Sequence, residues 1–337
     1  MRLRPAEKII PYVKAPPEIV PGIANYYAST SGSPSGVGVL IKTREGRPIK
    51  LEGNPDHPLT QGKLNSRDQL DIFNLYDPDR LTAPVKLDRA RKEPTAIAWA
   101  AADAEIAELL KQAAGQIVLL TGTIHGPARK RVIEDFKRAF PGTRHIMYDA
   151  WTHEVSRNMQ QKCYGRKVLP AYQVDKAEYL LCFESDPLGS GYSATEWQVG
   201  FGKNRKVRDG KLNKLVVFDA NVTFTGASAD ERFRIQLHAG FEIAMAIANE
   251  LAMAGRSECG SAMEIADSTR TYAARSVEGK EGLPEGTISR IARELWRHRG
   301  ESIVFGRESE SLQIAVNLLN SMLGNEGKTI DGTAAPS

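Results

Sequence analysis

Cysteine is scarce in this chain, and its scarcity argues against several kinds of site. The 337 residues contain three cysteines, Cys163, Cys182 and Cys259, which are widely spaced and form no Cys-x-x-Cys pair. An odd, scattered set of this kind argues against a disulfide framework and against a zinc or iron–sulfur site built from this chain alone. Cys182 lies within an apolar run, residues 179–183, so we expect it to be a small buried hydrophobic residue.

Other patterns are missing as well. No apolar run approaches the roughly 20 residues that a helix needs to cross a bilayer. The formal net charge is only +4, with basic and acidic residues interleaved, so no basic stripe indicates nucleic-acid binding. The six histidines never lie three or four positions apart, and no GxSxG or HExxH motif occurs. The residues alone therefore point to no catalytic nucleophile and no metal centre.

What the sequence does contain is an alternation of short apolar runs and amphipathic segments after residue 94. Strands are expected at residues 117–121, 145–148, 179–183, 215–218 and 302–305, and helices at 95–112, 127–140, 154–162, 238–254, 286–297 and 311–323. Apolar strands that are each followed by a helix are typical of a parallel sheet covered on both faces. The predicted fold class is therefore α/β, with a doubly wound, mostly parallel sheet.

The N-terminal part of the chain has a different character. Its first 25 residues include five prolines, which predict an extended arm because proline cannot continue a helix. A Ser/Gly-rich loop then leads to alternating residues at 37–43 and 49–52 that flank a glycine-containing turn, and this pattern predicts a β-hairpin. A charged linker bounded by prolines follows at residues 84–94. The expected domains are the extended proline-rich arm (1–25), a small β-hairpin domain (26–84) and the α/β domain (85–337).

Three loops follow predicted strands at positions where open α/β sheets bind ligands. They are residues 122–126, 184–191 and 219–226. Helix N-termini at such positions attract phosphate groups, so a soluble nucleotide-binding enzyme stays open as one interpretation. Ordinary strand-to-helix turns are the alternative explanation, since none of the three loops is a P-loop or a GxGxxG match.

Several segments resemble the molybdopterin-oxidoreductase superfamily. They are EKIIPYVKAPPEIVPGIANYYAST (7–30), VLIKTREGRPIKLEGNPDHP (39–58), LYDPDRL (75–81), VVFDANVTFTGASADERFRI (216–235), SIVFGRESES (302–311) and LLNSMLGNEGKTI (318–330). The chain resembles most closely the molybdopterin-like N-terminal part of the large iron–sulfur-protein subunits of bacterial alternative complex III. That resemblance implies a role in a quinol:cytochrome c, or high-potential carrier, oxidoreductase of an electron transport chain.

The departures from the superfamily fall on its cofactor positions. Its cluster-binding loop carries four cysteines, its Asp-Pro-Arg segment is Asp219-Ala220-Asn221 here, and its Pro-Gly-Thr-Asp segment is residues 239–242. The resemblance thus implies vestigial cluster positions at Thr30, Ser33, Val37 and Asn65, and vestigial pterin positions at Asp219, Asn221 and Glu242. No catalytic residue, metal ligand or bound cofactor is expected in residues 1–337. Iron–sulfur clusters are expected only in a C-terminal ferredoxin-like part that this sequence does not contain.

The resulting hypothesis is a cofactor-free scaffold within alternative complex III, without an active site of its own. The resemblance implies as partners quinol-oxidising integral membrane subunits, haem c subunits and the ferredoxin-like part of the same complex. It also implies a peripheral location on the outer, periplasmic face of the cytoplasmic membrane, after twin-arginine export directed by a signal not present here, and a chain incomplete at its C-terminus. The rival hypothesis is a catalytic molybdenum or tungsten oxidoreductase subunit.

Overall fold

The computed structural model describes residues 14, 16–32, 36–88, 93–113, 115–124, 126–206, 210 and 212–332. The chain separates into two compact units, residues 1–150 and 151–337, and each is described by itself. Most of the predicted arm (residues 1–13 and 15) and the predicted cluster position Ser33 lie outside the described residues. The finer division predicted from the sequence, with boundaries after residues 25 and 84, stays a prediction.

The first unit begins with an antiparallel sheet in the order β1-β2-β3. Its strands are β1 (Asn25–Thr30), β2 (Gly38–Arg44) and β3 (Arg47–Gly53). The turn between β2 and β3 has positive φ at both Glu45 (51°) and Gly46 (74°), as in the type I′ turns that match the twist of paired strands. Val39 and Leu51 are buried on this sheet. The predicted hairpin is confirmed, and β1 adds a strand that the sequence pattern did not predict.

The rest of the first unit consists of short helices and small paired strands. These elements are α1 (Ser66–Leu70), α2 (Phe73–Tyr76), β4 (Val85–Asp88), β5 (Glu93–Ala96), α3 (Trp99–Gln112), β6 (Val118–Thr121), α4 (Pro127–Ala139) and β7 (Arg144–Met147). β4 pairs with β5 in antiparallel fashion, and β6 pairs with β7 in parallel. Within the segment predicted to be a charged linker, the described residues 85–88 and 93–94 belong to paired strands, and Val85 and Leu87 alternate with charged residues in β4.

The second unit is built on a parallel sheet in the order β11-β10-β9-β12. Its strands are β9 (Tyr179–Phe183), β10 (Lys214–Asp219), β11 (Glu231–Arg234) and β12 (Ser302–Gly306). β9 is central, because Leu181 pairs with Val216 on one side and with Val304 on the other. All residues of β9 are buried, which is the expected state of a parallel strand covered on both faces. The sequence did not reveal β11, since its residues ERFR lack an apolar run.

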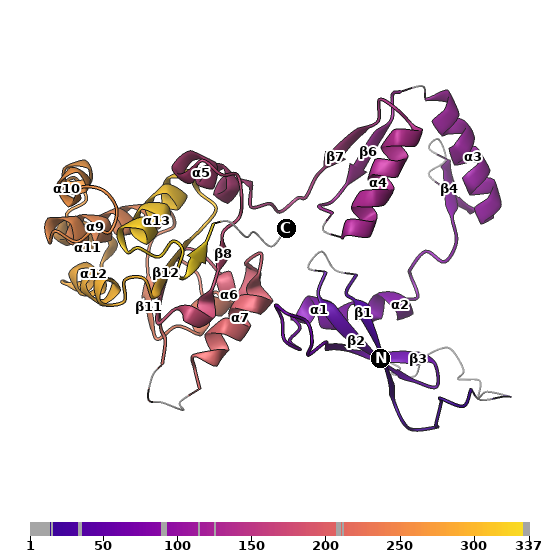
Figure 1. Ribbon diagram of the computed structural model, residues 1–337, viewed down its shortest axis with the longest axis horizontal. Coiled ribbons are helices and arrows are strands. Elements are labelled where there is room, and N and C mark those ends of the chain that lie inside the picture. The colour runs from indigo at the N-terminus through magenta and orange to yellow at the C-terminus, as the bar shows by residue number, and fades with distance from the viewer. Residues whose placement is uncertain are drawn as a thin grey trace. The chain divides into compact units, whose positions relative to one another are not determined.

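Helices cover both faces of this sheet (Figure 1). The helices of this unit are α5 (Glu154–Tyr164), α6 (Pro187–Ser190), α7 (Ala194–Lys203), α8 (Phe224–Ala227), α9 (Gly240–Met253), α10 (Ala262–Thr269), α11 (Ala274–Glu281), α12 (Thr287–Arg297) and α13 (Glu310–Met322). One face packs against α9, α12 and α13 through Ile247, Leu295 and Leu319, and the other packs against Leu188 of α6 and Trp197 of α7. The predicted α/β fold is confirmed.

Two further strands lie in the second unit, at β8 (Ala171–Tyr172) and β13 (Ile330–Asp331), and they pair with each other in antiparallel fashion. A short 3₁₀ helix, Val174–Lys176, precedes β9. Across the described ranges, each helix is too short or too polar to span a membrane.

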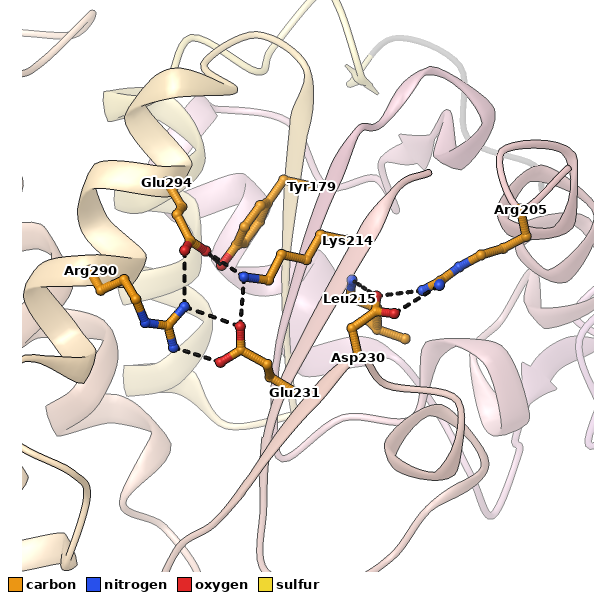
Figure 2. Close-up of polar contacts among 8 residues, drawn as sticks. All are labelled: Tyr179, Arg205, Lys214, Leu215, Asp230, Glu231, Arg290 and Glu294. Carbon is orange, nitrogen blue, oxygen red and sulfur yellow. Dashed lines mark hydrogen bonds and ion pairs between the residues drawn. The ribbon is translucent and has the colours of Figure 1, made fainter. Parts of the chain in front are cut away.

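A network of charged side chains ties α12 to the amino ends of β10 and β11 (Figure 2). Lys214 Nζ lies 2.6 Å from a carboxylate oxygen of Glu231 and 2.8 Å from one of Glu294, and Arg290 reaches the same two carboxylates at 2.6 and 3.0 Å. Burial opposes ionisation of both carboxyls, but hydrogen bonds from Lys214 and Arg290 outweigh it and lower the pKa of Glu231 and of Glu294. The network therefore stabilises the sheet–helix packing in its ionised form.

Replacing Lys214 with methionine is expected to lower the free energy of unfolding by about 1 kcal/mol at pH 7. A carboxyl whose folded pKa is lowered adds stability above its ordinary pKa, about 4.3 for glutamate, and that stability is lost as the pH falls through the lowered value. The cost of the substitution should therefore shrink when urea unfolding is repeated at about pH 3. The control is Lys86→Met at an exposed ion pair, which should leave the free energy of unfolding almost unchanged at pH 7 and at about pH 3. If Lys214→Met lowered the free energy of unfolding equally at both pH values, the stabilising role of the ionised network would be contradicted.

Candidate functional site

The candidate site lies at the carboxyl edge of the parallel sheet in the second unit. β9 is flanked by β10 on one side and by β12 on the other, so the chain connections diverge at this point. Ligands of open α/β sheets bind outside the strand ends at such a switch point. Of the three predicted loops, residues 184–191 and 219–226 meet at this edge, through Asp186 and Thr225, whereas residues 122–126 follow β6 in the other unit.

Glu184, directly after β9, places a buried carboxylate at this edge. Its Oε1 accepts a hydrogen bond of 3.0 Å from the N–H of Gly240, the first residue of α9, and its Oε2 accepts one of 2.8 Å from Nε of Arg307. Arg307 also donates to Nδ1 of His238 at 2.6 Å. The Glu184 side chain is only 2% exposed, so its charge is matched by protein groups rather than by water.

The backbone at this edge is shaped around the Glu184 carboxylate. Glu184 and His238 have φ values of 47° and 75°, in the left-handed region that residues with a Cβ rarely adopt. Conformations of this kind cluster at clamps and functional sites. At Gly240, an added Cβ would lie 3.3 Å from the Cβ of Phe183 and 3.4 Å from the carboxyl carbon of Glu184. A glycine at position 240 therefore lets the start of α9 approach the carboxylate closely.

A second carboxylate holds two of the predicted loops together. Oδ1 of Asp186 accepts hydrogen bonds from the N–H (2.8 Å) and the hydroxyl (2.6 Å) of Thr225. The same hydroxyl oxygen accepts a hydrogen bond of 3.0 Å from the N–H of Leu188. Because Thr225 is fully buried, these bonds fix the loop after β9 to the loop after β10.

The three predicted pterin positions have different surroundings. Asp219, at the end of β10, is 5% exposed. Its Oδ1 accepts a hydrogen bond of 3.3 Å from the N–H of Asn221. Its Oδ2 is buried without a hydrogen-bond partner among the described residues. Asn221 is exposed. Glu242, in the first turn of α9, pairs with Lys280 of α11 at 2.6 Å. Of these positions, Asp219 keeps a buried acceptor that the described part of the chain does not satisfy.

Glu308, two residues after β12, connects the carboxyl edge to α5. Its carboxylate accepts hydrogen bonds from Nδ1 of His153 (2.9 Å) and from the N–H (2.9 Å) and hydroxyl (2.6 Å) of Ser156. Burial would raise the pKa of Glu308, but the hydrogen bonds from His153 and Ser156 outweigh it and lower the pKa. No sequence pattern indicated this contact, since the partners lie 155 and 152 positions away along the chain.

The cluster-type loop of the first unit is held by polar side chains of α1 and of the residue that follows it. Asn65, a predicted cluster position, is the N-cap of α1, and its side-chain oxygen accepts a hydrogen bond of 2.8 Å from the N–H of Asp68. This is the usual role of an N-cap asparagine. The buried carboxylate of Asp68 accepts a bond of 3.0 Å from the hydroxyl of Ser31, and Asp71 accepts one of 2.9 Å from the N–H of Gly32. Two carboxylates therefore fix this loop, and the amide of Asn65 caps the helix that carries one of them.

Two further predicted cluster positions flank the same loop. Thr30 ends β1 and is exposed, and Val37 is 4% exposed. The N–H of Ser31 donates a hydrogen bond of 2.8 Å to the carbonyl oxygen of Val37, which closes the base of the loop. The structure thus brings Thr30 and Val37 close together, and their match to cluster ligands stays a prediction.

Asn325, in the segment LLNSMLGNEGKTI, belongs to a buried network around the edge strand β12. Its side-chain oxygen accepts hydrogen bonds from the N–H of Gly300 (3.2 Å) and the hydroxyl of Ser302 (3.1 Å), and its amide donates to Oδ1 of Asn320 at 2.9 Å. Asn320 in turn bonds both main-chain groups of Val304, each at 3.0 Å. These side chains satisfy an edge that would otherwise leave backbone groups unpaired.

Comparison with known proteins gives a consistent picture. No family model matches the chain. It is 23% identical, over 90% of its length, to the molybdopterin-binding-like subunit of menaquinone reductase from Nitratidesulfovibrio vulgaris strain Hildenborough, of which it covers 45%. It is 23% identical, over 68% of its length, to the molybdopterin-containing subunit of arsenate respiratory reductase from Shewanella sp. strain ANA-3, of which it covers 27%. Its fold is similar to that of acetylene hydratase from Pelobacter acetylenicus, with a TM-score of 0.60 and 14% identity over 91% of this chain and 42% of that one.

These similarities support the molybdopterin-oxidoreductase superfamily. The chain spans less than half the length of each of these relatives. Within the superfamily, the closer resemblance to the subunit of alternative complex III stays a prediction.

Proposed function

We propose that this chain is a cofactor-free structural part of a quinol-oxidising complex in an electron transport chain. The complex would be of the alternative complex III type and would pass electrons from quinol to a cytochrome c or another high-potential carrier. The observation that carries the proposal is the cluster-type loop, which Asp68 and Asp71 fix through hydrogen bonds while Asn65 caps the helix that carries Asp68. The fold then serves packing and assembly, and the chain has no active site of its own.

An iron–sulfur cluster does not fit the donors of this loop. Clusters are held by cysteine thiolates, and the matching positions carry the hydroxyl of Thr30, the apolar side chain of Val37 and the amide of Asn65. Asn65 is already committed to capping α1. Elsewhere, Cys182 is fully buried in β9, and burial raises the pKa of its thiol, which disfavours the thiolate that iron requires.

A pterin cofactor with phosphate groups does not fit the carboxyl edge of the sheet. Phosphates bind at helix N-termini, and the N-terminus of α9 already donates to the carboxylate of Glu184. The guanidinium of Arg307 is paired with the same carboxylate. A phosphate at this position would meet a buried negative charge and would have to displace it from both of its partners.

A place in a larger assembly is supported by the relative that is named as a subunit of menaquinone reductase. We propose as partners the quinol-oxidising integral membrane subunits, the haem c subunits and a ferredoxin-like part of the same complex, which would carry the iron–sulfur clusters. The proposed location is the periplasmic face of the cytoplasmic membrane, reached by twin-arginine export, with this chain peripheral to the bilayer.

The test compares substitutions at the pterin-type positions with loss of the whole protein. Deleting the gene in the organism that encodes it should abolish quinol:cytochrome c oxidoreduction in its membranes, and the wild-type gene should restore it. Asn221→Ala and Glu242→Gln should restore the activity to the same level, because a cofactor-free chain binds nothing at these positions. A loss of about a hundredfold or more in both variants, with the complex still assembled, would overturn the proposal.

One observation favours a second function, that of a catalytic molybdenum or tungsten oxidoreductase subunit. Oδ2 of Asp219 is buried without a partner among the described residues. In dinucleotide-binding folds an acidic residue in the second strand–helix unit of the sheet binds ribose hydroxyls, so a ligand with hydroxyl donors would satisfy this atom. Under this alternative, Asp219→Asn would lower the activity of a folded protein, and molybdenum or tungsten would follow the chain through purification.

A further inference from the structure

A cavity of about 280 Å³ lies within the second unit, walled by α5, by α13 and by the two separate segments that contain β8 and β13. None of the residues at the carboxyl edge discussed above lines it. Val168, Tyr172 and Ile330 supply apolar surface, and the remaining wall is formed by amides, a second tyrosine and charged side chains. Its volume is close to the lower end of the roughly 300–1,000 Å³ that small-molecule sites occupy.

Two asparagines of α13 line the cavity, and their amides are used differently. Asn320 uses both the oxygen and the nitrogen of its amide, through Val304 and Asn325. Asn317, which is 4% exposed, accepts a hydrogen bond of 3.0 Å from Nε2 of Gln160 at its Oδ1, while its Nδ2 is buried without a partner in the described parts of the chain. A buried donor without an acceptor is destabilising, so this amide calls for an acceptor that those residues do not provide.

The hydroxyl of Tyr172 is a second unused group in the cavity wall. Its ring is fixed by packing against Phe305 and Trp197, with centroids 4.7 and 5.6 Å away. Within the residues that the structure describes, the hydroxyl makes no hydrogen bond. Burial raises the pKa of Tyr172, so the group is a neutral phenol that can donate. The other tyrosine of the wall, Tyr164, already donates to Glu326 at 2.6 Å.

The charges around the cavity do not favour a ligand of one sign. Arg166 is opposed by Glu326 and Asp331, which also line the cavity. The carboxylate of Glu326 already accepts hydrogen bonds from Tyr164 and Ser321. The unused donors are a neutral amide and a neutral phenol, so the group that they fit is a neutral acceptor oxygen set in an apolar frame.

We propose that this cavity binds a small, uncharged, largely apolar molecule that carries a carbonyl oxygen. The oxygen accepts hydrogen bonds from Nδ2 of Asn317 and from the hydroxyl of Tyr172, and the apolar part packs against Val168 and Ile330. The site stands apart from the function proposed above, because it uses none of the cluster-type or pterin-type positions.

The test titrates the full 337-residue chain with two probes of the same shape. Cyclohexanone carries the carbonyl oxygen, and methylenecyclohexane has the same ring without an acceptor. Binding is followed in proton–nitrogen correlation spectra of protein labelled at asparagine nitrogen. We expect cyclohexanone to bind about three- to tenfold more tightly, which is the usual effect of one or two net hydrogen bonds, and to shift the side-chain amide signal of Asn317 most.

Two substitutions separate the hydrogen bonds from the shape of the cavity. Asn317→Ala and Tyr172→Phe should each remove much of the preference for cyclohexanone, while methylenecyclohexane still binds. Because Tyr172→Phe keeps the ring packing, it tests the proposal even if Asn317→Ala fails to fold. The exposed Asn221→Ala should leave the preference unchanged. Equal binding of the two probes to the wild-type chain, no binding of cyclohexanone up to its solubility, or a preference that survives both substitutions would overturn the proposal.

Discussion

Asn325→Ala is expected to lower the free energy of unfolding of the second unit by about 3 kcal/mol. The side chain is fully buried, and its loss leaves the hydroxyl of Ser302 without its acceptor and Oδ1 of Asn320 without one of its donors. The N–H of Gly300 loses its contact with Asn325 but keeps the carbonyl oxygen of Leu323 at 2.8 Å. Each unpaired buried group costs about 1–3 kcal/mol. The late motif of the superfamily would then act in this chain by holding the edge strand β12 in place.

The measurement is urea unfolding followed by tryptophan fluorescence in a Trp99→Phe background. The remaining tryptophans, Trp151, Trp197 and Trp296, all lie in the second unit, so the signal reports that unit alone. Ser302→Ala removes one hydrogen bond of the network and should cost about 1 kcal/mol. Asn221→Ala, on the surface, should stay within about 0.5 kcal/mol of the wild type. If Asn325→Ala lowered the free energy of unfolding no more than Asn221→Ala does, the inference that the network holds β12 in place would be wrong.

Arg307→Ala is expected to be about as damaging, with a loss of about 3 kcal/mol. Removing the guanidinium leaves the carboxylate of Glu184, whose side chain is 2% exposed, with the N–H of Gly240 as its remaining hydrogen-bond donor among the described groups. An uncompensated buried charge of this kind is among the most destabilising single changes. The same urea experiment measures it.

A double substitution separates the buried charge from the loss of packing. Glu184→Gln combined with Arg307→Ala removes the charge but keeps an oxygen that can accept from Gly240, so it should cost about 1–2 kcal/mol less than Arg307→Ala alone. The control is the exposed ion pair of Arg275 and Glu285, whose side chains are 90% and 82% exposed. Arg275→Ala should lower the free energy of unfolding by less than about 0.5 kcal/mol. Arg307→Ala that behaved like Arg275→Ala would show that Glu184 is not held as a buried anion.

Apolar runs predicted the framework of the second unit well. β9, β10 and β12 are five or six residues of mostly Val, Leu, Ile and Phe, and burial on both faces of a parallel sheet requires such residues. β11 was missed because an edge strand can be polar. Helices α10 and α11 were missed because each spans eight residues, which is too short for helical periodicity to stand out.

The site was predictable only in part. The resemblance singled out Asn65 and Asp219, whose match to cofactor positions stays a prediction, and no sequence pattern indicated that Asp68 bonds Ser31 or that Glu184 bonds Gly240. Those pairs are 37 and 56 positions apart, and only the folded chain brings them together. A carboxylate after a strand has the same sequence signature whether it faces solvent, a ligand or the N-terminus of a helix, so its partner had to come from the structure.

A density map of the complex purified from the organism that encodes it tests directly whether this chain is free of cofactors. We expect continuous density from Asp68 to Ser31 in the cluster-type loop, with no cluster beside Asn65. We also expect the Glu184 carboxylate on the N-terminus of α9, with no pterin beside Asp219. Density for an iron–sulfur cluster next to Asn65, or for a pterin next to Asp219, would show that the chain holds a cofactor and would overturn the proposed function.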